Sequence, residues 1–203
     1  MTKFTTRFFI TLNVFFIISI LISIFFIDKP LAVFVRNNLD SLDKTISPVI
    51  SFIETIFGFN ITKYLFGFIA LLVGLVFYIK NKTSYTAKLF FFVGLTHILS
   101  RLTAGILKNV FLRARPYEYL NAGDTAKDFF SAGSSFPSGH TAHFFGLFLP
   151  IAVLYPNYKW ILILPVFVAF SRIIAVDHYL SDVIAGVYIS ILFTGLFAKI
   201  FKF

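Results

Sequence analysis

Long apolar runs without charge constrain this chain more than any other feature. The first runs from Phe8 to Ile27, close to the about 20 residues that a helix needs to span a bilayer. Charged residues make up 13% of the chain and hydrophobic residues 58%, whereas soluble domains carry about 25% charged residues. Most of the surface of this chain therefore has to lie in lipid, and its 203 residues are the size of one domain.

Six apolar segments are expected to cross the membrane as helices. They are residues 8–27, 61–79, 86–112, 137–155, 159–176 and 181–200. A further stretch near residues 46–59 has an amphipathic pattern and is expected to form an interfacial helix. The sequence therefore predicts an all-α, polytopic membrane helix bundle with six transmembrane helices, in which residues 1–203 form a single domain.

The charges predict how this bundle is oriented. Both termini and the turns at 80–88 and 156–159 fall on one side, with eight of the 18 Lys and Arg residues and none of the nine acidic residues. Short basic segments favour the cytoplasmic side, so we expect a multi-pass plasma-membrane protein, in a bacterial inner membrane, whose acid-bearing side faces outward. The net charge of +9 is scattered between apolar runs, which favours membrane lipids or a phosphate substrate as partners over nucleic acid.

Three polar clusters interrupt the apolar pattern where predicted helices meet the outer face. The first holds Lys108 and Arg115. Seven residues are two helical turns, so both cations point the same way if the helix continues that far, although Pro116 favours a helix boundary there. Lys and Arg suit an anion such as phosphate, and a pair of side chains that snorkel to the interface is the alternative interpretation.

The second cluster is PSGH, which includes Ser138, Gly139 and His140. Ser138 can cap a following helix, whose free N–H groups would bind an anion. Gly139 has no side chain, so a ligand could approach the backbone closely, and His140 lies in the first turn. An ordinary serine-capped helix start with an incidental histidine is the alternative.

The third cluster contains Arg172, His178 and Asp182. His178 and Asp182 are four residues apart, which makes them neighbours on a helix. A carboxylate bonded to one imidazole nitrogen leaves the other free as a base or nucleophile; an interfacial histidine with a capping aspartate is the alternative. Taken together, the three clusters predict phosphoryl transfer, in which cations neutralise the phosphate oxygens and two histidines act as nucleophile and proton donor.

These motifs resemble a known family. K-x6-R-P from Lys108, P-S-G-H ending at His140 and S-R-x5-H-x3-D ending at Asp182 are similar to the signature of the type 2 phosphatidic acid phosphatases. That family shares its active-site design with vanadium haloperoxidases and bacterial acid phosphatases. The resemblance implies an integral membrane phosphatase that hydrolyses a lipid phosphate monoester or diphosphate, with no metal and no cofactor. Its candidate substrates are phospholipid or isoprenoid-lipid phosphates: undecaprenyl diphosphate, lipid A phosphate, phosphatidylglycerophosphate and phosphatidic acid.

The resemblance also implies a role for each matching residue. His178 would attack phosphorus and form a phosphohistidine, Asp182 would orient it, and His140 would protonate the leaving group. The phosphate would be held by Lys108, Arg115, Ser138, Gly139 and Arg172. A lipid phosphotransferase using the same phosphoenzyme is one alternative.

Two more polar residues lie within the third predicted span. They are His97 and Arg101, and with Lys108 they allow the other alternative, a small membrane transporter. Arg101 is expected to face the bundle interior below the site, paired or hydrogen-bonded. His143 is expected to support the structure, and Asp177 is assigned no role in catalysis.

Overall fold

The structure of the protein, a computed structural model, describes residues 6–123 and 128–203. Lys3 and the part of the predicted outer loop at 124–127 lie outside the described residues. Within the two ranges every regular element is a helix, which confirms the all-α prediction. The elements are α1 (Thr6–Ile22), η1 (Ser23–Ile27), α2 (Asp28–Asn38), α3 (Asp40–Ile56), α4 (Leu65–Lys80), α5 (Tyr85–Phe111), α6 (Pro116–Ala122), α7 (Gly139–Leu154), η3 (Pro156–Leu162), α8 (Ile163–Ile174) and α9 (Leu180–Phe201).

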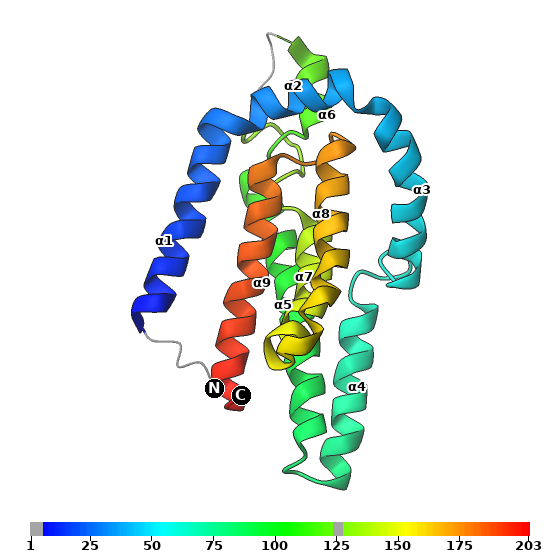
Figure 1. The fold of residues 1–203 in the computed structure, drawn as a ribbon, viewed down its shortest axis with the longest axis vertical. Helices are drawn as coiled ribbons and strands as arrows, with labels where there is room; N and C mark the ends of the chain where they lie inside the picture. The colour runs from blue at the N-terminus through cyan, green and yellow to red at the C-terminus, as the bar shows by residue number, and fades with distance from the viewer. Residues whose placement is uncertain (1–5, 124–127) are drawn as a thin grey trace.

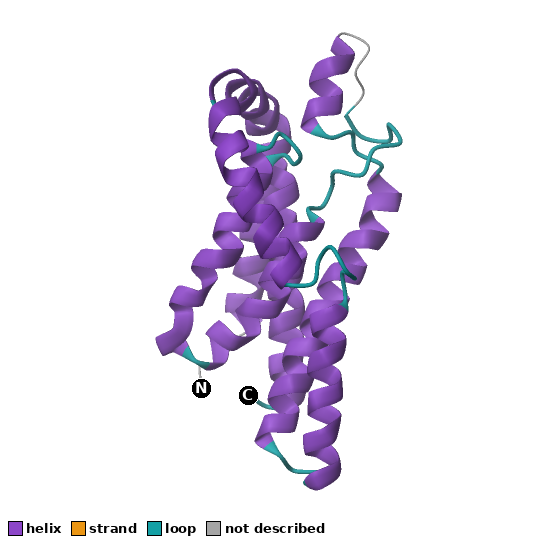
Figure 2. Cartoon of the chain, turned by 90° about the vertical axis from the view of Figure 1, so that its right-hand side faces the viewer, coloured by secondary structure: helices purple, strands orange, loops and turns teal. Residues whose placement is uncertain are grey.

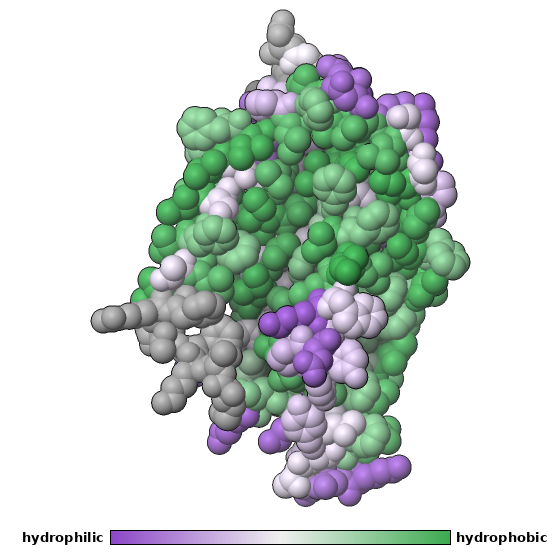
Figure 3. Space-filling model, viewed as in Figure 1, coloured by the Kyte–Doolittle hydropathy of each residue, from purple (hydrophilic) through white to green (hydrophobic). Residues whose placement is uncertain are grey.

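Several of these helices are apolar enough to cross a bilayer. Four are also long enough, namely Phe9–Asn38, Tyr85–Ala122, Pro156–Ile174 and Leu180–Phe201, and two shorter apolar helices span Leu65–Lys80 and Gly139–Leu154. The face of the molecule in Figure 3 carries a broad band of apolar side chains, with hydrophilic residues at its upper end and in its lower part. Exposed apolar surface of this extent requires a lipid environment, so the chain is a multi-pass membrane protein.

Three helices, α5, α7 and α9, form the centre of the bundle and contact one another. Around them α1 packs against α9, α4 against α5, and α3 against α8 (Figure 1). Figure 2 shows the same bundle from a second side, with its helices joined by loops. Glycines permit the close central contacts. A Cβ added at Gly146 would lie 3.0 Å from the His97 Cα, and one added at Gly186 would lie 2.8 Å from the Ser138 carbonyl oxygen. Small residues allow membrane helices to approach in this way.

Two segments differ from the sequence-based expectation. The region from residue 28 to residue 60 contains α2 and α3, and α3 begins at Asp40, well before the predicted amphipathic stretch. Asp40 and Asp43 lie in its first turn, where negative charge stabilises a helix start. The predicted polar loop from Arg113 to Phe136 contains α6, because Pro116 starts a helix and the Glu118 carboxylate accepts a hydrogen bond from the Arg115 N–H at 2.7 Å.

The two ends of the bundle differ. In Figure 1, α1 begins and α9 ends at the lower end, while α2 lies across the upper end and α3 descends from it beside α8. The connection from α3 to α4, residues 57–64, lies partway down the bundle (Figure 1). Irregular backbone at membrane depth is tolerated where it is buried in protein or lines a polar cavity. This connection meets the start of α7, and the polar residues gather there.

Candidate active site

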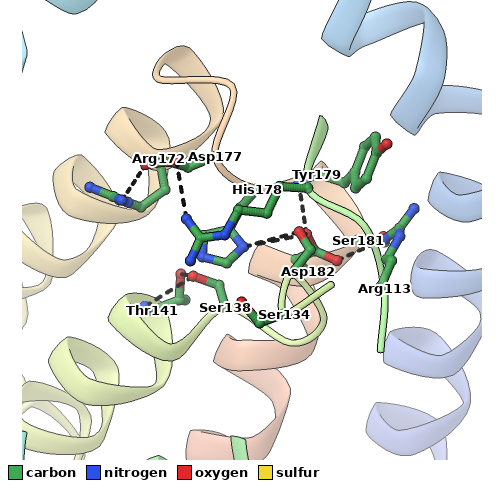
Figure 4. A network of polar contacts seen from close by, with 12 residues as sticks. Arg113, Ser134, Ser138, Thr141, Arg172, Asp177, His178, Tyr179, Ser181 and Asp182 are labelled. Atoms are coloured by element: carbon green, nitrogen blue, oxygen red, sulfur yellow. Dashed lines mark hydrogen bonds and ion pairs between the residues drawn. The ribbon is translucent and has the colours of Figure 1, made fainter. Parts of the chain in front are cut away.

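His178 lies in the short turn between α8 and α9, beside Asp182 in the first turn of α9. The His178 Nδ1 is 3.4 Å from the Asp182 Oδ2 (Figure 4). The same carboxylate oxygen accepts hydrogen bonds from the Ser135 Oγ at 2.5 Å and from the Tyr179 N–H at 2.8 Å. Because Asp182 also caps the start of its own helix, its carboxylate is held in place independently of the imidazole. The other nitrogen, Nε2, points away from Asp182 and is available for chemistry.

The environment keeps the His178 imidazole neutral. Its side chain is 2% exposed, and burial lowers the pKa of His178 to about 4, although the hydrogen bond to Asp182 opposes this shift. A neutral imidazole has the free lone pair that a nucleophile requires. Asp182 therefore orients a ring that is already unprotonated near neutral pH.

We expect His178 to stay neutral at pH 6, where an unperturbed histidine is mostly protonated. The measurement is a pH titration of ¹⁵N-imidazole resonances of the protein in detergent micelles. The chain has four histidines, and His178→Gln identifies the signal by removing it. An ionisation of this signal at or above the ordinary pKa would contradict the burial argument.

His140 lies opposite His178, in the first turn of α7. The two ring centroids are 6.4 Å apart. The His140 Nε2 is 3.1 Å from the Glu54 Oε1, and the ring stacks on Phe59 with centroids 4.1 Å apart. Glu54 comes from α3 and Phe59 from the α3–α4 connection, so the segment that enters partway into the bundle fixes this ring.

The three predicted phosphate-binding cations surround the two rings, but not by sharing a helix. The helix α5 ends at Phe111, where Leu112 turns into the left-handed region at φ 43°, so the condition for the helical alignment of Lys108 and Arg115 is not met. Arg115 instead precedes α6 and its Nη1 lies 3.2 Å from the Asp177 Oδ1. Tertiary structure, rather than helical periodicity, brings the cations together.

Asp177, which received no catalytic assignment from the sequence, links two of these cations. Arg172 contacts its other carboxylate oxygen through Nη2, and the Arg172 Nη1 lies 3.5 Å from the Glu54 Oε1. The Lys108 ammonium donates to the carbonyl oxygens of Ser134 and Ser135, the latter at 3.1 Å. Each of the three cations is thus held by oxygen atoms of the protein on one side. Its remaining N–H groups can donate to an anion.

Ser138 caps α7, as the sequence predicts. Its hydroxyl oxygen accepts from the Thr141 N–H at 3.4 Å and from the Thr141 hydroxyl at 3.0 Å (Figure 4). The sequence analysis expected Gly139 to lack a side chain so that a ligand could approach the backbone. The structure gives a different reason. An added Cβ would lie 2.9 Å from the Nη1 of Arg101, so the side of Gly139 is covered by a guanidinium group.

Arg113 is the residue that sequence reasoning missed, although it lies between Lys108 and Arg115. It is fully buried, and its Nη1 donates to the Asp182 Oδ1 at 2.7 Å. Its Nη2 reaches the Asp28 Oδ2 at 2.9 Å and its Nε the Asp128 Oδ1 at 2.8 Å. The ring of Tyr179 covers the guanidinium at 3.9 Å. Arg113 therefore holds Asp182 in place, from the side opposite His178.

Other polar expectations fall inside the bundle. Arg101 is 6% exposed and faces the interior, as predicted, but its guanidinium forms none of the expected ion pairs or hydrogen bonds with the described residues. His143 and His97 are fully buried, and the His97 Nε2 lies 2.9 Å from the His143 Nδ1. The His143 Nδ1 also lies 3.2 Å from the Lys63 carbonyl oxygen. This pair ties α5 and α7 to the α3–α4 connection.

Apolar helices define a multi-pass membrane protein, and they bring two histidines, a buried aspartate and three cations to one place, as the predicted phosphate site requires. Comparison with known proteins agrees. Residues 85–203 match the PAP2 superfamily. Since this is more than half of the chain, the protein belongs to the PAP2 superfamily.

Two curated relatives are similar to the chain over part of its length. One, from Rhizobium johnstonii, is named lipid A 1-phosphatase and is 32% identical over 126 residues, which are 60% of this chain and 52% of the relative. A lipid A 1-phosphatase of Rhizobium etli is 37% identical over 95 residues, 45% of this chain and 41% of the relative. The chain thus spans about half the length of these relatives or less. No solved structure matches it significantly.

Proposed function

We propose that this protein is a lipid phosphate phosphatase that works through a phosphohistidine. The observation that carries the proposal is the pairing of His178 with Asp182 at 3.4 Å, with His140 on the other side at a ring separation of 6.4 Å. The two imidazoles thus lie close enough to act on the same phosphate group. In-line transfer needs a nucleophile on one side of phosphorus and a proton donor on the other.

The first step transfers the phosphoryl group to the enzyme. The His178 Nε2 attacks phosphorus, the bond from phosphorus to the lipid oxygen breaks, and His140 gives that oxygen a proton. In the second step His140 takes a proton from water, whose oxygen attacks phosphorus, and the bond to Nε2 breaks to release inorganic phosphate. Lys108, Arg115 and Arg172 stabilise the charge on the three equatorial oxygens. These cations supply the charge that a metal ion would otherwise provide.

We further propose six membrane crossings with the site near the outer face. The pairing of α1 and α9 at one end of the bundle supports an even number of crossings. The two short apolar helices have 16 residues each, about 24 Å at the helical rise, and α4 is extended by the part of α3 that enters the bundle. Lipid A 1-phosphate belongs on the substrate panel because of the relatives' names, beside isoprenoid and glycerolipid phosphates.

The test is release of inorganic phosphate from this panel by the purified protein in detergent. Activity is expected to be the same with and without EDTA, because protein cations and not a metal neutralise the phosphate. A metal-dependent alkaline phosphatase in the same buffer is the control for chelation. Loss of all activity on chelation, or no phosphate release from any lipid phosphate, would contradict the proposal.

A further inference from the structure

Arg101 is a buried cation with no anionic partner in the part of the chain that the structure describes. It is 6% exposed, yet among the described residues its guanidinium has no ion pair or hydrogen bond, and its buried Nε is unpartnered. The other arginines near the site differ, since Arg113 contacts three carboxylates and Arg115 and Arg172 share Asp177. A buried charge without compensation is costly, so this guanidinium is suited to a negative charge that a ligand brings.

The Arg101 guanidinium lies on one particular side of the site. It covers Gly139 at the start of α7, where an added Cβ would meet its Nη1 at 2.9 Å. Its Cζ is 5.7 Å from the centre of the Phe59 ring, and that ring stacks on His140. Arg101 thus belongs to the side of His140, away from the contact between His178 and Asp182.

A second cation borders the same ring. The Lys63 Nζ is 6.0 Å from the centre of the Phe59 ring, and Lys63 has no carboxylate partner among the described residues. The position of Lys63 is fixed because its carbonyl oxygen lies 3.2 Å from the His143 Nδ1. The Arg101 guanidinium also lies against Gly139 of the predicted phosphate-binding motif, which places this pair beside the predicted phosphate site.

We propose that Arg101 and Lys63 form a subsite for a second anionic group, so that the preferred substrates are lipids ending in a diphosphate. This inference rests on the proposed function. With His178 as nucleophile, the leaving group departs on the opposite side, toward His140. Two cations there that have no carboxylate partner within residues 6–123 and 128–203 fit a charged leaving group better than a neutral alcohol.

The reaction on such a lipid balances as follows. The His178 Nε2 attacks the terminal phosphorus, and the bond from that phosphorus to the bridging oxygen breaks. The bridging oxygen keeps the electron pair, becomes part of the departing lipid monophosphate, and takes a proton from His140. Arg101 and Lys63 neutralise the charge that develops on this leaving phosphate, whereas Lys108, Arg115 and Arg172 hold the phosphoryl group that moves.

The test compares two substrates with the same tail, farnesyl monophosphate and farnesyl diphosphate, using the full chain in detergent. Wild-type protein is expected to have the higher kcat/KM for the diphosphate. Arg101→Gln should lower the ratio of diphosphate to monophosphate kcat/KM by about 10²-fold, and Arg101→Lys should restore part of it. Lys63→Gln, at an exposed position, should lower the ratio by about threefold to tenfold. Lys82→Gln, an exposed lysine in the turn between α4 and α5, is the control and should leave the ratio unchanged.

Each other outcome overturns the inference. Equal losses on both substrates would assign Arg101 to the moving phosphoryl group or to folding, and a wild-type preference for the monophosphate would remove the subsite. Should Arg101→Gln fail to fold, two other measurements test the subsite. One is the substrate ratio of Lys63→Gln, and the other is inhibition of the wild-type protein, which methylenediphosphonate should inhibit at a lower concentration than inorganic phosphate does. Hydrolysis of the monophosphate without a preference for the diphosphate would contradict the proposed subsite but not the proposed function. Absence of hydrolysis of either lipid, together with the rest of the panel, defeats the proposed function as well.

Discussion

Replacing His178 with alanine is expected to lower phosphate release from a lipid phosphate by at least about 10⁴-fold, because the variant has no nucleophile to form the covalent intermediate. Brief incubation of wild-type protein with ³²P-labelled lipid should yield labelled protein whose phosphate is lost in acid and retained in base, as expected of a phosphohistidine. His178→Ala should carry no such label. The measurements are the initial rate of phosphate release and the radioactivity retained by the protein.

A buried histidine outside the proposed chemistry provides the matched control. His143 is fully buried and contacts His97 and the α3–α4 connection, so His143→Gln tests the effect of changing an interior imidazole. It is expected to keep forming the acid-labile phosphoenzyme. Phosphate release by His178→Ala at the wild-type rate would remove the proposed mechanism, whatever the control does.

Replacing Arg113 with glutamine is expected to destabilise the protein by about 3–5 kcal/mol, because Asp28 and Asp182 would remain buried without their counter-charge. In a chain of this size that corresponds to a fall in Tm on the order of 10 °C. Activity should fall as well, since Asp182 would lose the contact that holds it behind His178. Thermal unfolding in detergent and the rate of phosphate release measure the two effects.

The exposed ion pair between Lys44 and Asp40 offers the comparison. Its side chains are 75% and 70% exposed, and such pairs contribute little because water screens them. Lys44→Ala should therefore leave Tm and activity unchanged. An Arg113→Gln protein as stable as Lys44→Ala would show that the buried network does not hold the site together.

The helical class and the apolar segments followed from the sequence because the solvent is lipid and only satisfied backbones can cross it. The limits of α4, α5, α7, α8 and α9 were predicted within a few residues. The region from Asp28 to Asn60 was not, because its mixed composition does not distinguish an interfacial helix from α2 and α3. Nothing in periodicity indicated that α3 would enter the bundle partway and bring Glu54 to His140.

The candidate site, like the fold, was predicted only in part from the sequence. Motif spacing indicated His140, His178 and Asp182, since each is adjacent in sequence to a helix start that the structure contains. The partners that hold them come from distant parts of the chain, as when Arg113 joins Asp28 to Asp182. One signal was present: a cation two residues before Arg115, in a chain whose acidic residues all fall on the same predicted side. The identity of its partners depends on tertiary contacts that no local pattern encodes.

The match to the superfamily begins at residue 85, but several residues before it reach the candidate site. Asp28 contacts Arg113, and Glu54 contacts both His140 and Arg172. The helices before residue 85 therefore contribute contacts to the candidate site and cannot be exchanged freely for those of another protein. Grafting residues 85–203 onto another protein's first helices would leave Arg113 with one carboxylate fewer and His140 without its acidic neighbour, so a working site requires both parts of this chain.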